Sequence, residues 1–214
     1  MPNHIKNILK FNRKKYPNIF EELLDKDGDF DFNKLIPMPE RLMLIEGSIT
    51  NIAIKYVKLI DENKFLDEKQ NLEEQNKNFI KSLKNNEPIE DYREIYKKYD
   101  IKNLYDLGKL YLKNEKEYGC HTWYDWCIKN WGTKWNAYEQ QHLSNKFYNI
   151  IIFETAWSYP RPIIEKLAEK YDFTLYYADE DIGYNCGKID FVEGTKYISN
   201  LKNSNDFANK VWRY

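Results

Sequence analysis

Residues 148–178 read YNIIIFETAWSYPRPIIEKLAEKYDFTLYYA, and this stretch decides the fold class. Its first part, Tyr148–Thr155, is β-branched and aromatic enough to predict a central strand. A helix is predicted from Ser158 to Tyr171, because two prolines fall in its first turn and apolar residues recur on one face. Phe173–Ala178 then predicts the next strand.

Further elements extend this pattern in both directions along the chain. Lys188–Val192 predicts another strand after a glycine-containing turn at 183–187, and Thr122–Trp131 predicts a helix ahead of the first strand. The resulting order of helix, strand, helix, strand and strand is typical of an α+β protein. We therefore expect a ferredoxin-like sandwich.

The N-terminal residues add a strand and a short helix to this core. His4–Phe11 alternates between an apolar side and a polar side, which predicts a strand with one polar face. Pro17 suits the first turn of a helix that continues through Leu24. The acidic residues 25–31 predict a turn, and Phe32–Ile36 predicts a short extended segment.

From about residue 40 to residue 117 the apolar residues recur with a helical period. Polar linkers such as residues 85–88 separate several short helices. Four apolar stripes are expected to face a common core: Ile52, Tyr56, Leu59 and Ile60; Phe79, Ile80 and Leu83; Tyr92, Ile95, Tyr96 and Tyr99; Leu104, Leu107, Leu110 and Tyr111. The chain is thus expected to divide into an N-terminal strand–helix part of the α+β core (1–44), a helical insertion (45–117) and a ferredoxin-like C-terminal part (118–214).

Composition and charge narrow the class of function. The 33 basic and 34 acidic residues give a net charge of −1, whereas a protein that grips nucleic acid by its phosphates usually has a basic excess. We therefore expect no direct nucleic-acid binding. No apolar run reaches the roughly 18 residues of a membrane span, and the N-terminus lacks the apolar centre of a signal peptide. A cytoplasmic protein, in the cytoplasm of a host cell, is expected.

No cofactor and no metal site are expected from the motifs. Three cysteines are too few for a four-thiolate iron–sulfur site, and paired CxxC spacing for zinc is absent. The aspartates of residues 25–31 resemble a calcium-binding loop, but Phe30 and Ile36 stand where that loop needs Gly and Glu. There is no P-loop, GxGxxG or GxSxG sequence, so no catalytic residue is identified.

An aromatic segment, TWYDWCIKNWGTKWNAY at 122–138, is the first candidate binding region. Trp123, Trp126 and Trp131 share one helical face, which indicates a helix fastened to a sheet by large rings. The alternative is that some of these rings, with Trp135 and the polar residues between them, line a pocket or a partner surface. Both interpretations remain open at the level of sequence.

An acidic loop, YADEDIGYNCG at 177–187, is the second candidate region. Asp179, Glu180 and Asp181 offer oxygen ligands of the kind that Mg²⁺ and Ca²⁺ prefer. The alternative is a solvated turn between two strands, with Gly183 and Gly187 supplying unusual backbone angles.

Five motifs in order resemble the YubB-like family of phage and plasmid proteins, which carries a C-terminal ferredoxin-like domain. The motifs are MPNHIKN at 1–7, FDFNKLIPMPE at 30–40, YGCHTWYDWCIKNWGTKWNAY at 118–138, FETAWSYP at 153–160 and YADEDIG at 177–183. The resemblance implies an origin in a mobile element and a ferredoxin-like fold. It transfers no catalytic residue, because the family has no established activity.

The leading hypothesis is a non-enzymatic binding protein of a phage or mobile element that inhibits a host defence factor, such as a CRISPR-type nuclease complex. Its partner would be a host protein or ribonucleoprotein, held by protein–protein contact rather than at a membrane. Capture of a small molecule or nucleotide signal is the first alternative, and metal-dependent hydrolysis at residues 179–181 is the second. The candidate binding residues are Trp123, Trp126, Trp131, Trp135, Asn136, Tyr138, Trp157, Asp179, Glu180 and Asp181.

Overall fold

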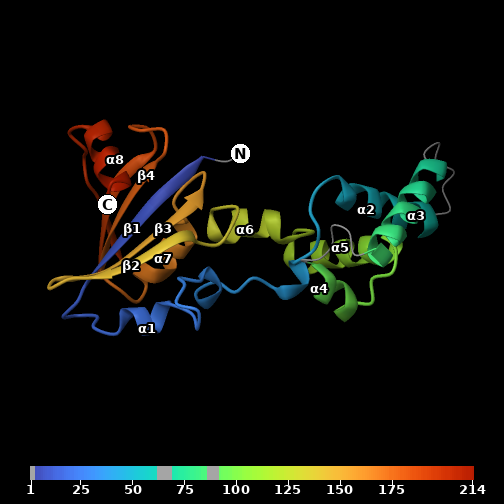
Figure 1. Ribbon diagram of the computed structural model, residues 1–214, viewed down its shortest axis with the longest axis horizontal. Coiled ribbons are helices and arrows are strands. Elements are labelled where there is room, and N and C mark those ends of the chain that lie inside the picture. Colours follow the sequence, from blue (N-terminus) through green and yellow to red (C-terminus); the bar gives the residue numbers. More distant parts are fainter. Residues whose placement is uncertain (1–2, 62–68, 86–91) are drawn as a thin grey trace. The chain divides into compact units, whose positions relative to one another are not determined.

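The computed structural model describes residues 3–61, 69–85 and 92–214. The chain forms two compact units, one built from residues 1–37 and 127–214 and the other from residues 38–126. The first unit contains a β-sheet with flanking helices, and the second unit is helical (Figure 1). The boundary between the units falls within helix α6, Trp123–Trp131.

The sheet has the strand order β2-β3-β1-β4-β5-β6, and all neighbouring strands are antiparallel. The strands are β1 His4–Asn12, β2 Tyr138–Ser144, β3 Tyr148–Ala156, β4 Phe173–Asp179, β5 Cys186–Val192 and β6 Thr195–Ile198. β1 lies between β3 and β4, and pairs along nearly its whole length with both. The N-terminal strand is therefore the centre of the sheet.

Helices cover both faces of this sheet. α8 (Ser204–Trp212) packs on one face, where Ala208 and Val211 contact Ile8 and the neighbouring apolar residues of β3 and β4. The opposite face carries Phe11 and Phe153 and is covered by α1 (Ile19–Leu23), α7 (Arg161–Ala168) and the segment with Phe30. Figure 1 shows α8 above the sheet and α1 and α7 below it.

Most of the predicted strands and helices of this unit are confirmed, with two corrections. The segment at 32–36 is not extended but begins with a 3-10 helix, Phe32–Lys34, because the Asp31 side chain accepts a hydrogen bond from the Asn33 N–H and caps it. The second face of β1 is not simply polar, because α8 packs on it and buries Ile8. Three features were not predicted from the sequence: β6, α8 and the strand character of β2.

The helical unit contains a 3-10 helix at Glu40–Leu42 and the helices α2 Ser48–Asp61, α3 Lys69–Asn85, α4 Arg93–Lys98 and α5 Leu104–Tyr118. α5 begins at an Asn103 side-chain cap and ends at Gly119, whose φ of 73° is the left-handed conformation that terminates helices. The predicted stripe on α5 is buried throughout. Of the linker predicted at residues 85–88, Asn85 belongs to α3 and residues 86–88 lie outside the described residues.

The stripe predicted on α2 is wrong only at Ile60, which is 51% exposed, because Leu59 is buried and Ile52 and Tyr56 are partly buried against the helical core. Ala53 and Val57, which were not predicted, are buried as well. They lie at a close approach of α2 and α5 at Gly108, where an added Cβ atom would lie 2.6 Å from Val57 Cγ2 and closer still to the Ala53 carbonyl oxygen. Small residues permit this contact, and a search for large apolar residues does not detect it.

Replacing Gly108 with Ala tests this close approach. The added methyl group meets backbone that cannot move aside, so we expect the free energy of unfolding to fall by about 1–3 kcal/mol. Urea unfolding measures the change. The Lys113→Ala variant on the exposed side of the same helix is the control and is expected to stay within about 0.5 kcal/mol. Equal stability of the two variants would contradict the packing described for α2 and α5.

Candidate functional site

The three tryptophans of α6 differ in their surroundings. Trp126 and Trp131 are buried, and Trp131 Nε1 donates a hydrogen bond to the Ile36 carbonyl at 2.9 Å. The Trp131 ring also meets the Phe32 ring edge-on, with 5.7 Å between the ring centroids. Trp123 is half-buried, and among the described residues its Nε1 has no hydrogen-bond partner. Packing in the interior thus explains the presence of Trp126 and Trp131 without a binding role.

Asn136 connects the segment after α6 to the acidic turn. Its Oδ1 accepts hydrogen bonds from the N–H groups of Phe32 and Ala137, both at 2.9 Å, and its Nδ2 donates to Asp31 Oδ1 at 2.6 Å. The side chain is therefore occupied in holding the segment after α6 to residues 31 and 32 of the N-terminal part of the chain.

The acidic loop at 179–181 is held against the start of β1. Asn3 Nδ2 donates to Asp179 Oδ1 at 3.3 Å and to Asp181 Oδ2 at 2.8 Å, and the Asp181 N–H donates to Asp179 Oδ1 at 2.9 Å. Trp157 is 40% exposed with a φ of 70°, and its N–H donates to the Asn3 carbonyl. These contacts fix two of the three predicted carboxylates by hydrogen bonds.

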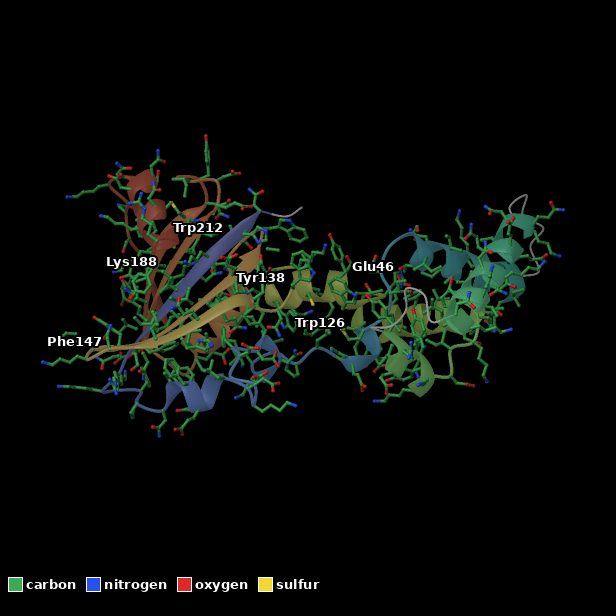
Figure 2. All side chains as sticks on the ribbon, in the orientation of Figure 1. Glu46, Trp126, Tyr138, Phe147, Lys188 and Trp212 are labelled. Atoms are coloured by element: carbon green, nitrogen blue, oxygen red, sulfur yellow. The ribbon has the colours of Figure 1, made fainter. Side chains whose placement is uncertain are left out.

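An open cavity of about 720 Å³ lies at this end of the sheet, on the face that α8 covers. Figure 2 shows Tyr138 near the start of β2 and Trp212 on α8, two of the rings that line it. The lining residues are His4, Trp135, Asn136, Ala137, Tyr138, Glu139, Glu154, Glu180 and Trp212. We call this cavity the aromatic–acidic pocket.

Hydrogen bonds fix most of the walls of the aromatic–acidic pocket. His4 Nδ1 lies 2.8 Å from the Tyr138 hydroxyl and 3.8 Å from Glu154 Oε2. The His4 N–H donates to Glu180 Oε1 at 2.9 Å. Trp212 Nε1 donates to the Asp179 carbonyl at 2.8 Å. The pocket is therefore built by β1, β2, β3, the loop after β4 and α8 together.

A β-bulge presents Glu139 to the pocket. The register between β2 and β3 shifts between Tyr138 and Gln141, and Glu139 adopts a φ of 45°, a left-handed conformation that costs a non-glycine residue energy. Gln140 secures the bulge, because its Oε1 accepts from the Phe30 N–H at 2.7 Å and its Nε2 donates to the Ala137 carbonyl at 3.1 Å.

The carboxylates give the pocket a negative field. Burial raises the pKa of Glu154, and the nearby carboxylates of Glu139 and Glu180 act in the same direction, while His4 and Lys6 oppose them. Burial and the same three carboxylates raise the pKa of Tyr138 to about 12. Such perturbed groups in a cavity are a physical sign of a functional site.

The structure brings only part of the predicted set together. Trp135, Asn136, Tyr138 and Glu180 line the pocket. Trp123, Trp126, Trp131, Trp157, Asp179 and Asp181 are not among its lining residues. Sequence reasoning missed His4, Glu139, Glu154 and Trp212. One signal was available: Glu154 is the only charged residue in the apolar run YNIIIFET.

Within the described residues, 3–61, 69–85 and 92–214, no group of three or more His, Cys, Asp and Glu side chains is arranged to hold a metal ion. None of the helices in these ranges combines the length and the apolar character that crossing a membrane requires.

Comparison with known proteins supports the fold. Residues 130–210 match a family model described as "Ferredoxin-like domain in Api92-like protein", so the chain contains a ferredoxin-like domain and the predicted α+β class is confirmed. The order β1, α6, β2, β3, α7, β4 is the β-α-β-β-α-β order of that fold, with the helical unit inserted between β1 and β2. The matched residues do not include β1, the central strand.

One solved structure is similar in outline. It is the crystal structure of the protein Api92 from Yersinia pseudotuberculosis, which has a TM-score of 0.45 and 9% sequence identity over 94% of this chain and 99% of that chain. No curated protein matches the sequence.

Replacing Glu154 with Gln tests the electrostatics of the pocket. Because the folded-state pKa of Glu154 is raised above its usual 4.5, the folded protein holds this proton more tightly than the unfolded chain. The stabilisation from this proton is fully present below the unfolded-state pKa of about 4.5. It is lost as the pH rises through the folded-state pKa of Glu154. We therefore expect the free energy of unfolding of E154Q, relative to the wild type, to increase with pH. Urea unfolding between acidic and neutral pH measures it, and a constant difference would contradict the raised pKa.

Proposed function

We propose that the protein is a non-enzymatic binding protein whose aromatic–acidic pocket receives a basic side chain of a partner protein. The observation that carries the proposal is the combination of three large rings and three carboxylates around one open cavity. Ring faces attract cations through their quadrupole, and carboxylates attract them by charge. Together they match a lysine ammonium or an arginine guanidinium group.

The carboxylates of the pocket are balanced only in part by the chain itself. Lys6, whose Nζ lies 5.8 Å from the Trp212 ring centroid, lowers the pKa of Glu154 but forms no ion pair among the described residues. Among the described residues, Glu139 and Glu180 form no ion pair, and Glu154 Oε2 lies 3.8 Å from His4 Nδ1, a contact that is an ion pair only when His4 is protonated. Lys134 lies over the Trp135 ring, with its Nζ 4.5 Å from the ring centroid, but it does not line the pocket. A partner's cation would therefore complete a charge balance that the chain leaves incomplete.

The setting that we propose is a phage or another mobile element. Its basis is the resemblance of five sequence motifs to the YubB-like family. In that setting the protein inhibits a host defence factor, such as a CRISPR-type nuclease complex, by protein–protein contact. Proteins that hold nucleic acid do so with Lys and Arg side chains, and an acidic pocket walled by rings complements such a surface.

A small molecule is the second candidate occupant, because a cavity of about 720 Å³ falls in the size range of ordinary ligand pockets. The three carboxylates favour an organic cation here over a nucleotide, whose phosphates they would repel. Hydrolysis at the acidic loop gains no such support, because Asn3 already hydrogen-bonds Asp179 and Asp181.

A pair of matched peptides tests the pocket directly. A short peptide with one arginine is compared with the same peptide carrying citrulline, which has the same shape without the charge. We expect the arginine peptide to bind in calorimetry and the citrulline peptide not to bind. The E180Q variant, which removes one rim charge, is expected to weaken binding about five-fold, or ~1 kcal/mol.

Two further variants separate binding from folding. E139G removes a carboxylate but relieves a left-handed φ, so it is expected to weaken peptide binding while changing stability by no more than about 1 kcal/mol. Glu21→Gln changes an exposed glutamate of α1 that does not line the pocket and is expected to bind like the wild type. Equal binding of the arginine and citrulline peptides would contradict the proposal that the pocket binds a cationic side chain.

The host partner is tested by affinity capture. Tagged wild type and the triple variant E139Q/E154Q/E180Q are compared in lysate of a host that carries a CRISPR-type system. We expect a nuclease component to be retained on the wild type and lost from the triple variant. Retention of the same component by both would place its binding outside the pocket, and recovery of none would contradict the inhibitor hypothesis.

A further inference from the structure

A second cavity, of about 200 Å³, lies further along the same face of the sheet. It lies between the sheet and α8, and β1, β4, α8 and the C-terminal residues supply its walls. The lining residues are Ile8, Lys10, Tyr176, Phe207, Lys210, Val211 and Tyr214. We call it the lysine pocket, because two of these residues are lysines.

Aromatic rings form the walls of the lysine pocket. Tyr176 and Phe207 are stacked, with 6.2 Å between centroids and 22° between ring planes. Lys10 Nζ lies 4.9 Å from the centroid of Tyr176 and 4.3 Å from that of Tyr214, so the ammonium group is held between two rings. The aliphatic residues Ile8 and Val211 are buried beneath them.

The two lysines carry uncompensated positive charge. Among the described residues, neither Lys10 nor Lys210 forms an ion pair. Lys188, which stands opposite Tyr176 on the next strand, instead pairs with Asp190 at 2.7 Å. The charge of Lys188, beside the lysine pocket, is therefore neutralised, whereas the charges of Lys10 and Lys210 in the pocket are not. An anion is the group that would balance it.

We infer that the lysine pocket binds a small ligand in which an aromatic ring carries an anionic group, as in a nucleoside monophosphate. The rings and aliphatic residues suit a planar apolar group, which stacks on aromatic faces, and the two ammonium groups suit a phosphate or carboxylate. The volume of about 200 Å³ is below that of a drug-sized ligand site, so it accommodates one ring system.

This inference does not rest on the proposed function. The lysine pocket and the aromatic–acidic pocket share no lining residue, and their charges have opposite sign. A protein that binds no basic side chain can still bind an aromatic anion here, and the reverse also holds. Variants of one pocket therefore serve as controls for the other.

Three probes separate the ring from the charge: adenosine monophosphate, adenosine and inorganic phosphate. Binding to the full-length chain is measured by calorimetry and by saturation-transfer NMR at low salt. We expect adenosine monophosphate to bind with a Kd below about 1 mM, and each of the other two to bind at least about ten-fold more weakly. Raising the salt concentration is expected to weaken the binding of the monophosphate, since the lysines are at or near the surface.

Matched variants assign the binding to the pocket. Lys210→Met is expected to weaken binding of the monophosphate about five-fold, and Lys10→Met at least as much, whereas Lys10→Arg retains it because the charge remains. Tyr214→Phe keeps the ring and is expected to bind normally, while Tyr214→Ala is expected to bind more weakly. The control is Lys202→Met, an exposed lysine that does not line the pocket, and it is expected to bind like the wild type.

Three results would overturn the inference. The first is equal binding of adenosine and adenosine monophosphate, which would remove the anionic group from recognition. The second is an equal loss of affinity for adenosine monophosphate in the Lys202→Met and Lys210→Met variants, which would show that general surface charge attracts the ligand. The third is a loss of affinity in E180Q as large as that in Lys210→Met, which would show that the ligand binds in the aromatic–acidic pocket. Far-UV circular dichroism confirms that each variant compared is folded.

Discussion

The double pairing of β1 is the constraint on which the sheet and both of its pockets depend. Ile8 pairs with Ile152 of β3 on one side and with Tyr176 of β4 on the other. Asn7 is fully buried beside it, and its Nδ2 donates to Thr155 Oγ1 at 2.8 Å. The partner in the adjacent strand satisfies the Asn7 Nδ2, whereas the Asn7 Oδ1 has no hydrogen-bond partner among the described residues. If β1 were absent, the strands β3 and β4 would have no common neighbour.

The same strand supplies both pockets with a polar residue. His4 lies at its start and enters the aromatic–acidic pocket, whereas Lys10 lies near its end and enters the lysine pocket. The end of α8 contributes to both pockets, because Trp212 lines the first and Val211 lines the second. Opposite charges therefore occur on one face of the sheet.

Local patterns in the sequence predicted the fold well where a single element explains the pattern. YNIIIFET and FTLYYA are strands because β-branched and aromatic residues fit a pleated, buried surface. Gly108 shows the limit of such reasoning, since the small residues where α2 and α5 meet produce no apolar stripe. α8 was missed because its amphipathic face is short and interrupted by polar residues.

The candidate site was less predictable than the fold, for a physical reason. His4, Glu154 and Trp212 come together only through strand register and the packing of α8, which no local pattern in the sequence encodes. The conspicuous tryptophans of α6 were a weaker guide, because Trp126 and Trp131 are buried. Glu139 depends on a bulge, and a bulge is decided by the pairing of two strands.

The central claim is that the aromatic–acidic pocket binds a cationic side chain. It is tested most directly by NMR of the tryptophan indole N–H groups during titration with the arginine peptide. The account predicts that the resonances of Trp135 and Trp212, which line the pocket, shift together and saturate, while those of the buried Trp126 and Trp131 stay in place. Shifts confined to Trp123 or Trp157, or no shift of Trp135 and Trp212 at saturating peptide, would contradict it.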